Sequence, residues 1–434
     1  MTRILLTTVE REFGLYDYYR ENAPEEFRWR FRSERKISYG LRFLRQNVPE
    51  IEILEYPTRA DYLKALEQGW DVVGFSFYIE ESNVILRMAR DARLAGIKQI
   101  WAGNYGALTP AIQADFDEVF IGYSEDAVAK KLGKSVDALR HPPLVTELRL
   151  PGGWPVAVGM LFTTRGCSFH CTFCQSGAFA PRPKAVPIES IKRVLHFYMD
   201  HGVRHVLILD ENFGNIPAHA DAVIEVLAET GIHWFVQSRV DLLVRNLDRW
   251  IAQGMEGALF GIESFHQELL QQMHKGSKAE AIAELAARLN QAGKYAHGYY
   301  IIGFPSETEA SIREDLKALA SLQLDVTQIT IVTPHPRTQL WDELDSKYGI
   351  FETDWSKFDT KHLVWRHPNC SPECLESLVR DGIELCYGPD RVGRTLRKFF
   401  CSRLRSGDLA RLFWSPVHTR WAVPGRLPYL PAGT

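Results

Sequence analysis

The sequence predicts an α/β protein: a doubly wound, Rossmann-like domain, then a partial, TIM-like (β/α)6 barrel, then a mainly helical C-terminal region. Two observations lead to this prediction. Short β-branched runs alternate with helical patterns twice along the 434 residues, and a segment rich in proline and glycine separates the two series. With 45% hydrophobic and 24% charged residues, the chain has the composition of a globular protein and the length for two or three domains. The predicted first domain, connection, barrel and C-terminal extension cover residues 1–140, 141–157, 158–345 and 346–434.

The first domain is predicted from five strand-like runs, which are Arg3–Thr8, Ile51–Glu55, Asp71–Phe77, Lys98–Ala102 and Glu118–Ile121. Between them, apolar residues recur at helical spacing in Glu34–Gln46, Ala60–Gln68, Ser82–Ala95 and Ser124–Leu132. This alternation predicts a parallel sheet with helices on its faces, and in such sheets ligands bind beyond the carboxyl ends of the strands. Those ends carry the candidate binding residues Ser76, Gly103, Asn104, Tyr105 and Gly122.

A second alternating series follows the connection between His141 and Pro155. Its predicted strands are Met160–Thr164, His205–Leu209, His233–Gln237, Gly257–Phe260, Gly298–Ile302 and Gln328–Val332, each followed by a helical stretch. Six such units predict a partial barrel, with the chemistry at the carboxyl ends of its strands.

Three cysteines, Cys167, Cys171 and Cys174, follow the first barrel strand in a Cys-x3-Cys-x2-Cys run, with no fourth cysteine in the neighbouring sequence. Structural iron–sulfur and zinc sites are normally closed by four protein ligands, so a three-cysteine site leaves one metal position open to a substrate or cofactor. A zinc knuckle and buried structural cysteines are the alternatives. The spacing, the preceding strand and the motifs downstream favour an iron–sulfur site.

The later strand ends supply polar or glycine-bearing motifs. Asp210 and Glu211 follow the second strand, and the third ends in Gln237, Ser238 and Arg239. Glu263 ends the fourth strand, Gly303 follows the fifth, and Thr333 follows the sixth. Each motif alone is equally compatible with an acidic turn or an ordinary ion pair, but their order after a three-cysteine loop is informative.

Together these motifs resemble the radical S-adenosylmethionine (radical SAM) superfamily over about residues 158–345. The resemblance implies that Cys167, Cys171 and Cys174 hold a [4Fe–4S] cluster whose open iron binds S-adenosylmethionine and cleaves it to a 5′-deoxyadenosyl radical. It also implies an electron donor such as flavodoxin or ferredoxin. The cofactor-binding residues expected from the resemblance are the backbone at Phe173 and Gly303 for adenine, Asp210 or Glu211 for the amino group, Arg239 for the carboxylate, Glu263 for the ribose or the amine, with Gln237, Ser238 and Thr333 beside them.

The first domain resembles the cobalamin-binding domain found ahead of many radical SAM domains. It departs from that pattern in two places, since no Asp-x-His-x-x-Gly motif is present and the usual Gly-Gly of the fourth strand is Gly103-Asn104. The resemblance implies cobalamin bound near Ser76, Gly103, Asn104, Tyr105 and Gly122, and methylation of an unactivated carbon in a small molecule or natural product. The alternatives are a domain that only covers the active site, a radical cyclisation, rearrangement or oxidation, and a non-catalytic metal- or cobalamin-binding regulator.

Charge and cysteine content set further expectations. The net charge of −3 argues against broad nucleic-acid binding, no apolar run is long enough to span a membrane, and seven cysteines fit a reduced cytoplasmic location. Cys370 and Cys374 suggest a second cluster, but such clusters usually need three or four ligands. Cys386 and Cys401 lie in helix-like apolar patterns and are expected to be packing residues, and the sequence does not fix the role of any of the four. The basic amphipathic segment Arg391–Phe413 fits a membrane surface or an anionic substrate, but we expect it to pack across the barrel. Nothing in the sequence identifies the substrate, a catalytic side chain or the oligomeric state.

Overall fold

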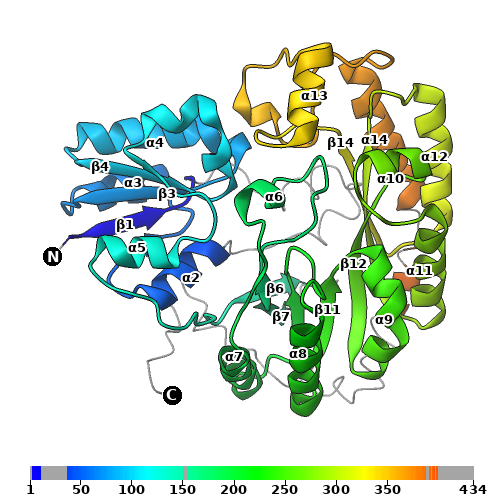
Figure 1. Cartoon of the computed structure of the whole chain (residues 1–434), viewed down its shortest axis with the longest axis horizontal. Coiled ribbons are helices and arrows are strands. Elements are labelled where there is room, and N and C mark those ends of the chain that lie inside the picture. Colours follow the sequence, from blue (N-terminus) through cyan, green and yellow to red (C-terminus); the bar gives the residue numbers. More distant parts are fainter. Residues whose placement is uncertain are drawn as a thin grey trace.

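The computed structural model describes residues 2–10, 37–149 and 155–387, together with 391, 393–395, 397 and 398. An α/β architecture with two main sheets is present in this part of the chain. In Figure 1 the N-terminal sheet, in blue and cyan, lies to one side of the larger sheet, in green and yellow.

The first sheet contains five parallel strands in the order β2-β1-β3-β4-β5. Their bounds are Ile4–Thr7 (β1), Glu52–Leu54 (β2), Val72–Ser76 (β3), Gln99–Gly103 (β4) and Glu118–Val119 (β5). The first four lie within one residue of the predicted run at each end, and β5 ends two residues earlier than predicted. In this order the chain reverses direction across the sheet between β1 and β3, which creates a crevice at the carboxyl edge.

Helices cover both faces of the first sheet. They are α2 (Tyr39–Asn47), α3 (Arg59–Leu66), α4 (Ser82–Leu94) and α5 (Glu125–Lys131). Apolar residues of α3 and α4 pack on one face in a core that includes Tyr62 and Met88, whereas α2 and α5 pack on the other through Leu41 and Val128. Burial on both faces explains why the strands read as continuous apolar runs.

The larger sheet has the order β14-β13-β12-β11-β10-β7-β6. Six strands are parallel: Pro155–Leu161 (β7), His205–Ile208 (β10), His233–Gln237 (β11), Met255–Glu263 (β12), Tyr295–Ile302 (β13) and Val326–Ile331 (β14). The seventh, β6 (Val145–Arg149), is antiparallel to β7. It corrects the prediction that residues 141–157 form only a connection. A strand at the edge of a sheet is held by backbone hydrogen bonds and needs no regular apolar pattern. The sequence of β6 therefore gave no strand signal, and the surrounding prolines and glycines indicated a connection instead.

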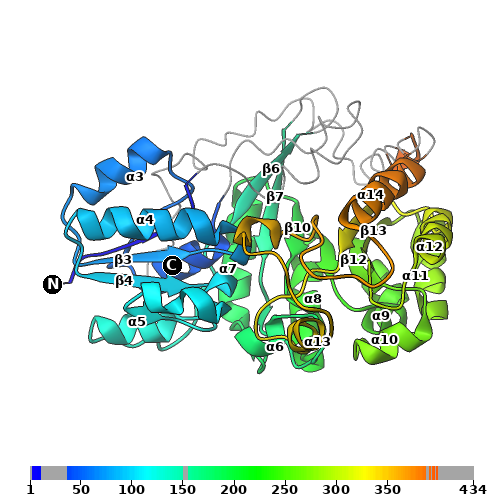
Figure 2. The ribbon, with the colours of Figure 1, turned by 90° about the horizontal axis from the view of Figure 1, so that it is seen from above.

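Helices follow the parallel strands and cover the outer face of the larger sheet (Figures 1 and 2). They are α7 (Ile188–Asp200), α8 (Pro217–Thr230), α9 (Val240–Ala252), α11 (Ala279–Gln291) and α12 (Glu309–Ser321). In α9, for example, Leu243, Leu247 and Trp250 are buried at helical spacing.

Shorter elements lie over the carboxyl ends of the barrel strands. These are the two-stranded pair β8 (Thr164–Arg165) and β9 (Lys184–Ala185), α6 (Ser176–Phe179), α10 (Gln267–Gln272) and α13 (Gln339–Tyr348). The helix α14 (Pro372–Cys386) packs on α12 and β14. Between α13 and α14 the chain forms a short 3-10 turn and an antiparallel bridge, Ile350 to Trp365, rather than further α-helix. Most of Arg391–Phe413, including Cys401, lies outside the described residues.

His141 joins the two parts of the chain. Its ring is fully buried, its Nε2 accepts a hydrogen bond from the backbone N–H of Phe162 at 2.9 Å, and its Nδ1 donates to the carbonyl of Pro142 at 2.6 Å. Because Nε2 accepts, the imidazole is neutral, and burial lowers the pKa of His141 to about 3.

Candidate active site

The cysteine loop leaves β7 through β8 and is held by neighbouring segments on several sides. The N–H of Cys167 donates to the carbonyl of Ala180 at 3.0 Å, and the N–H of Thr172 donates to the carbonyl of Met273 at 3.1 Å. The carbonyl of Thr172 accepts from the N–H of Leu340 at 2.9 Å. The loop is therefore positioned by backbone contacts with residues beside α6, α10 and α13.

The three thiols differ in exposure and interact electrostatically. Cys167 is buried, Cys171 is partly buried and Cys174 is exposed. Burial, together with the two neighbouring thiols, raises the pKa of Cys167 to about 11. Burial also raises the pKa of Cys171, against the opposing charges of Lys275 and Arg239.

The cysteine loop supplies three thiol groups as candidate metal ligands. Among the described residues, no three His, Cys, Asp or Glu side chains converge on one metal ion. In a cubane cluster each cysteine binds a different iron, so its ligands need not converge. Three thiolates can each hold one iron of a [4Fe–4S] cluster and leave the fourth iron free for a cofactor, so the chemistry of Cys167, Cys171 and Cys174 suits such a cluster.

Asp210 is placed differently from its predicted role. Its carboxylate is fully buried and accepts hydrogen bonds from the backbone N–H groups of Thr163 (2.6 Å) and Thr164 (3.0 Å) and from both their hydroxyls (2.5 and 2.6 Å). Burial raises its pKa to about 6 against these four donors. The Asp210 carboxylate is therefore enclosed and already bonded to four donors, and it fastens the start of the cysteine loop to β10.

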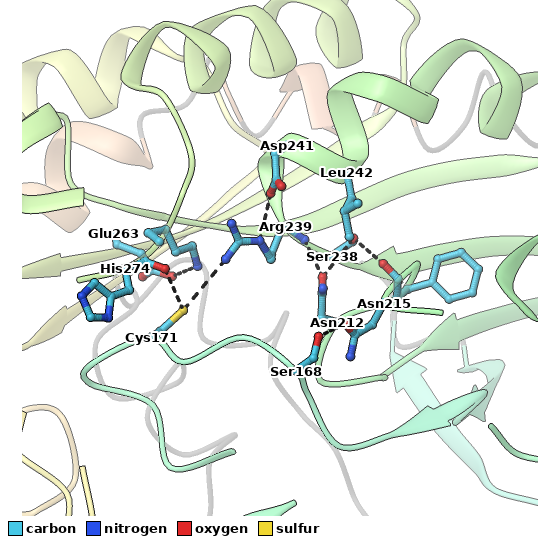
Figure 3. A network of polar contacts seen from close by, with 12 residues as sticks. Ser168, Cys171, Asn212, Asn215, Ser238, Arg239, Asp241, Leu242, Glu263 and His274 are labelled. Atoms are coloured by element: carbon cyan, nitrogen blue, oxygen red, sulfur yellow. Dashed lines mark hydrogen bonds and ion pairs between the residues drawn. The ribbon is translucent and has the colours of Figure 1, made fainter. Parts of the chain in front are cut away.

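Asn212 and Arg239 form a network beside the cysteine loop (Figure 3). The side-chain oxygen of Asn212 accepts from the N–H of Arg239 at 3.0 Å and from the Ser238 hydroxyl at 3.3 Å. The guanidinium of Arg239 donates through Nε to Asp241 at 2.9 Å, and its Nη1 lies 4.0 Å from the sulfur of Cys171. The sequence had proposed Arg239 and Ser238 but not Asn212, whose side-chain N is buried without a partner in the described structure.

Glu263 lies in a buried ion pair that sequence reasoning missed. Its Oε1 is 2.6 Å from Nζ of Lys275, and the two side chains are 8% and 9% exposed. Burial alone would lower the pKa of Lys275, but the charge and hydrogen bond of Glu263 raise it above its ordinary value. The Lys275 ammonium also lies 5.9 Å from the ring centre of Phe173. No sequence signal marks Lys275, which follows Glu263 by 12 residues on the far side of α10.

The last two strand ends are shaped by backbone geometry. Gly303 has φ +87°, and its N–H, like that of Phe304, donates to Glu307 at 2.7 Å. Thr333 is buried, and its hydroxyl donates to the carbonyl of Ile331 at 3.1 Å. Arg337 is exposed at φ +67°, a conformation that favours glycine.

The N-terminal candidates lie at the carboxyl edge of the first sheet, where Ser76 pairs in register with Gly103. Asn104 has φ 69° and ψ −171°, a region used almost only by glycine. A Cβ on Gly103 would have no neighbour closer than 3.9 Å, so the backbone there is open to a ligand.

This edge also packs on the segment after the cysteine loop. The ring of Tyr105 stacks on Phe179 at 4.3 Å, and its hydroxyl is 3.2 Å from Ser176. Gly122 has φ +88°, and a Cβ there would lie 2.8 Å from the carbonyl of Phe179. The positive φ and the packing on α6 each favour glycine at 122.

Comparison with known proteins identifies the barrel. Residues 161–319 match the Radical SAM superfamily. The chain contains a radical SAM domain. Members of this superfamily are enzymes that use a [4Fe–4S] cluster and S-adenosylmethionine, as the cysteine motif had predicted.

Individual relatives are more distant. An uncharacterized methyltransferase from Pyrococcus horikoshii is 28% identical over 232 residues, 52% of this chain and 50% of its own length. The bacteriochlorophyllide d C-8(2)-methyltransferase of Chlorobaculum tepidum is 22% identical over 364 residues, 75% of this chain and 80% of its own. The chain thus spans only about half the length of the first of these relatives.

A solved structure shares the fold. The radical SAM methyltransferase TsrM from Kitasatospora setae, determined with cobalamin and a [4Fe–4S] cluster bound, matches with a TM-score of 0.59 and 15% identity, over 80% of this chain and 78% of its own. At this identity the likeness extends to the fold alone. In the part of the chain that the structure describes, no helix has the length and apolar character of a membrane span.

Proposed function

We propose that this protein is a cobalamin-dependent radical SAM methyltransferase that acts on a small molecule. The observation that supports it most strongly is the direct packing of the segment after the cysteine loop on the carboxyl edge of the first sheet, where Tyr105 stacks on Phe179 at 4.3 Å. This contact brings the candidate cluster ligands and the candidate cobalamin edge to the same side of the barrel. The methyltransferase names of its relatives support the same reaction.

The cluster would be held by Cys167, Cys171 and Cys174. When bound, cluster and S-adenosylmethionine together supply a 5′-deoxyadenosyl radical that removes a hydrogen atom from the substrate. The protein's part is to keep the three thiolates in place and to surround Cys171 with positive charge. Arg239 and Lys275 supply that charge, because both act on the Cys171 sulfur and both are buried.

The cofactor would lie along the strand ends. Arg239 is suited to a carboxylate, because Asp241 is bonded to its Nε and the Nη groups face the cysteine loop. Glu263 and Lys275 together offer one acceptor and one donor for the ribose or the amino group. The backbone at Phe173 and at Gly303 is assigned to adenine, with Gln237, Ser238 and Thr333 as supporting residues. Asp210 is left out of direct contact because its four hydrogen bonds use its oxygens.

Cobalamin would bind at Ser76, Gly103, Asn104 and Tyr105, and when bound it supplies the methyl group that is transferred. The open backbone at Gly103 and the glycine-like conformation of Asn104 suit close approach of a large planar ligand. The first histidine of the chain is His141, whose two ring nitrogens are already hydrogen-bonded. A cobalamin at this edge would therefore lack a lower histidine ligand from residues 1–140.

The enzyme would also need a substrate and an electron donor. The substrate is taken to be a small molecule placed between the two cofactors, and the electron to come from a flavodoxin or ferredoxin. Holding the substrate between two closely spaced groups and excluding water is the main catalytic contribution expected of the protein itself.

The test is anaerobic purification with added hydroxocobalamin, reduction, and incubation with S-adenosylmethionine carrying a deuterated methyl group. Retained cobalamin that acquires the deuterated methyl group, together with 5′-deoxyadenosine, is the expected result. Formation of 5′-deoxyadenosine by a protein that binds no cobalamin would refute methyl transfer and favour a radical cyclisation, rearrangement or oxidation. Cobalamin binding without any cleavage would favour a regulator.

A further inference from the structure

We propose that Tyr123 and Glu211 are positioning residues that connect the first sheet to the first cluster ligand, Cys167. The inference deepens the proposed function and rests on it, because it assumes that Cys167 binds the cluster. The sequence had assigned Glu211 to the cofactor amine and had given no role to Tyr123.

Glu211 bridges two parts of the molecule through its two carboxylate oxygens. One oxygen accepts the N–H of Gly166 at 3.1 Å, and the other accepts the hydroxyl of Tyr123, which is 88 residues away in the sequence. Gly166 directly precedes Cys167 and has φ +88°. Because the N–H of Cys167 is itself bonded to Ala180, both peptide N–H groups at the start of the cysteine loop have fixed acceptors.

The ring of Tyr123 is in turn held by Arg165 and Phe179. Its ring lies 4.4 Å from the guanidinium carbon of Arg165 and meets Phe179 edge-on at 5.4 Å. Arg165 forms an ion pair with Glu125 at 2.6 Å, and these side chains are only 5% and 8% exposed. The ring of Phe43 lies 3.9 Å from the same guanidinium carbon. The phenol is therefore fixed by residues of α2, α5, β8 and α6 before it reaches Glu211.

The chemistry of this link is directional. The hydroxyl of Tyr123 has the only proton in this pair, because the Glu211 carboxylate presents acceptor oxygens alone, so the hydrogen bond runs from Tyr123 to Glu211. A carboxylate with two acceptor oxygens can serve Tyr123 and Gly166 at once, whereas an amide presents only one acceptor. A displacement at the carboxyl edge of the first sheet, where cobalamin is proposed to bind, would then reach Gly166 and Cys167 through two hydrogen bonds.

The experiment compares Tyr123→Phe and Glu211→Gln with the wild-type holoprotein after anaerobic cluster reconstitution. Tyr123→Phe keeps the ring contacts with Arg165 and Phe179 and removes only the hydroxyl. Tyr387→Phe is the matched control, because its hydroxyl bonds to the backbone of Thr327 far from the cluster. The readouts are the rate of iron loss to an iron(II) chelator and the electron paramagnetic resonance spectrum of the reduced cluster.

Each variant loses a hydrogen bond to a charged group, and because Tyr123 is 41% exposed, water replaces part of it; iron release is therefore expected to speed up several-fold in each variant. The spectrum of the reduced cluster should shift in both variants, and the double variant should add little to either single one. Tyr387→Phe should match the wild type. Wild-type iron release and spectrum in Tyr123→Phe, with methyl transfer intact, would overturn this inference alone. A wild-type protein that takes up no cluster would overturn the proposed function with it.

Discussion

Lys275→Met tests whether the buried ion pair beside Cys171 stabilises the barrel. At 2.6 Å the attraction between Lys275 and Glu263 is about 6 kcal/mol for an effective dielectric constant near 20. Much of this attraction offsets the cost of burying both charges. Removing one partner leaves the other charge buried and uncompensated, which costs about 3–5 kcal/mol.

The assay is thermal unfolding of the cluster-free protein, followed by near-ultraviolet circular dichroism. For a folding unit of roughly 150–250 residues, 1 kcal/mol shifts the midpoint by about 2–4 °C, so Lys275→Met should lower it by at least about 6 °C. The double variant Glu263→Gln/Lys275→Met removes both charges and should recover most of the loss.

The matched control is Lys347→Met, which breaks the exposed pair between Lys347 and Glu343. Both of those side chains are at least half exposed, so the midpoint should not change. The reasoning would be refuted if Lys275→Met melted at the temperature of the wild type, or if the double variant melted no higher than Lys275→Met.

Substitutions at His141, at Gly103 and Gly122, and at Asp210 test three further parts of the structure. Burial lowers the pKa of His141 to about 3, so on acidification the unfolded chain binds a proton near pH 6.5 whereas the folded chain does not. The free energy of unfolding should therefore fall by about 1.4 kcal/mol per pH unit between pH 6.5 and pH 3. Urea unfolding at pH 7 and pH 5 should show a smaller fall for His141→Gln than for the wild type. Gly103→Ala should fold normally but retain less cobalamin, measured by absorption spectra. Gly122→Ala should lower the melting temperature, because its Cβ would lie 2.8 Å from the carbonyl of Phe179. Equal effects of the two substitutions would contradict the roles assigned to the two glycines. Asp210→Ala leaves four hydrogen-bond donors without an acceptor. It should therefore reduce cluster uptake, measured as iron per chain, far more than Asp210→Asn.

Much of the fold could be predicted because its signals are local. Buried parallel strands produce continuous apolar runs, and the helices between them produce a helical period, so every predicted strand of both sheets overlaps an observed one. The poorest match is β7, which begins five residues before the predicted Met160–Thr164 and ends three residues before its end. The strand β6 was missed because its pairing with β7 depends on backbone hydrogen bonds at a sheet edge, which leave little trace in side-chain pattern.

The site was predictable only where spacing carries the chemistry. The three cysteines lie within eight residues of one another in a Cys-x3-Cys-x2-Cys run, and the radical SAM domain that they indicated is confirmed. The roles of Asp210 and Glu211 could not be separated, since both are carboxylates on one turn, and only the fold decides that one bonds Thr163 and Thr164 while the other reaches Gly166. Lys275 and Tyr123 were missed for the same reason, because their partners lie on other elements.

The most direct test of the central claim is the formation of 5′-deoxyadenosine from S-adenosylmethionine by the reduced, anaerobically reconstituted protein, measured by mass spectrometry beside Cys171→Ala. The account predicts about four iron atoms per chain and 5′-deoxyadenosine from the wild type, and no cleavage by the variant. A reconstituted wild-type protein that holds zinc at about one per chain, or that leaves S-adenosylmethionine intact, would contradict it.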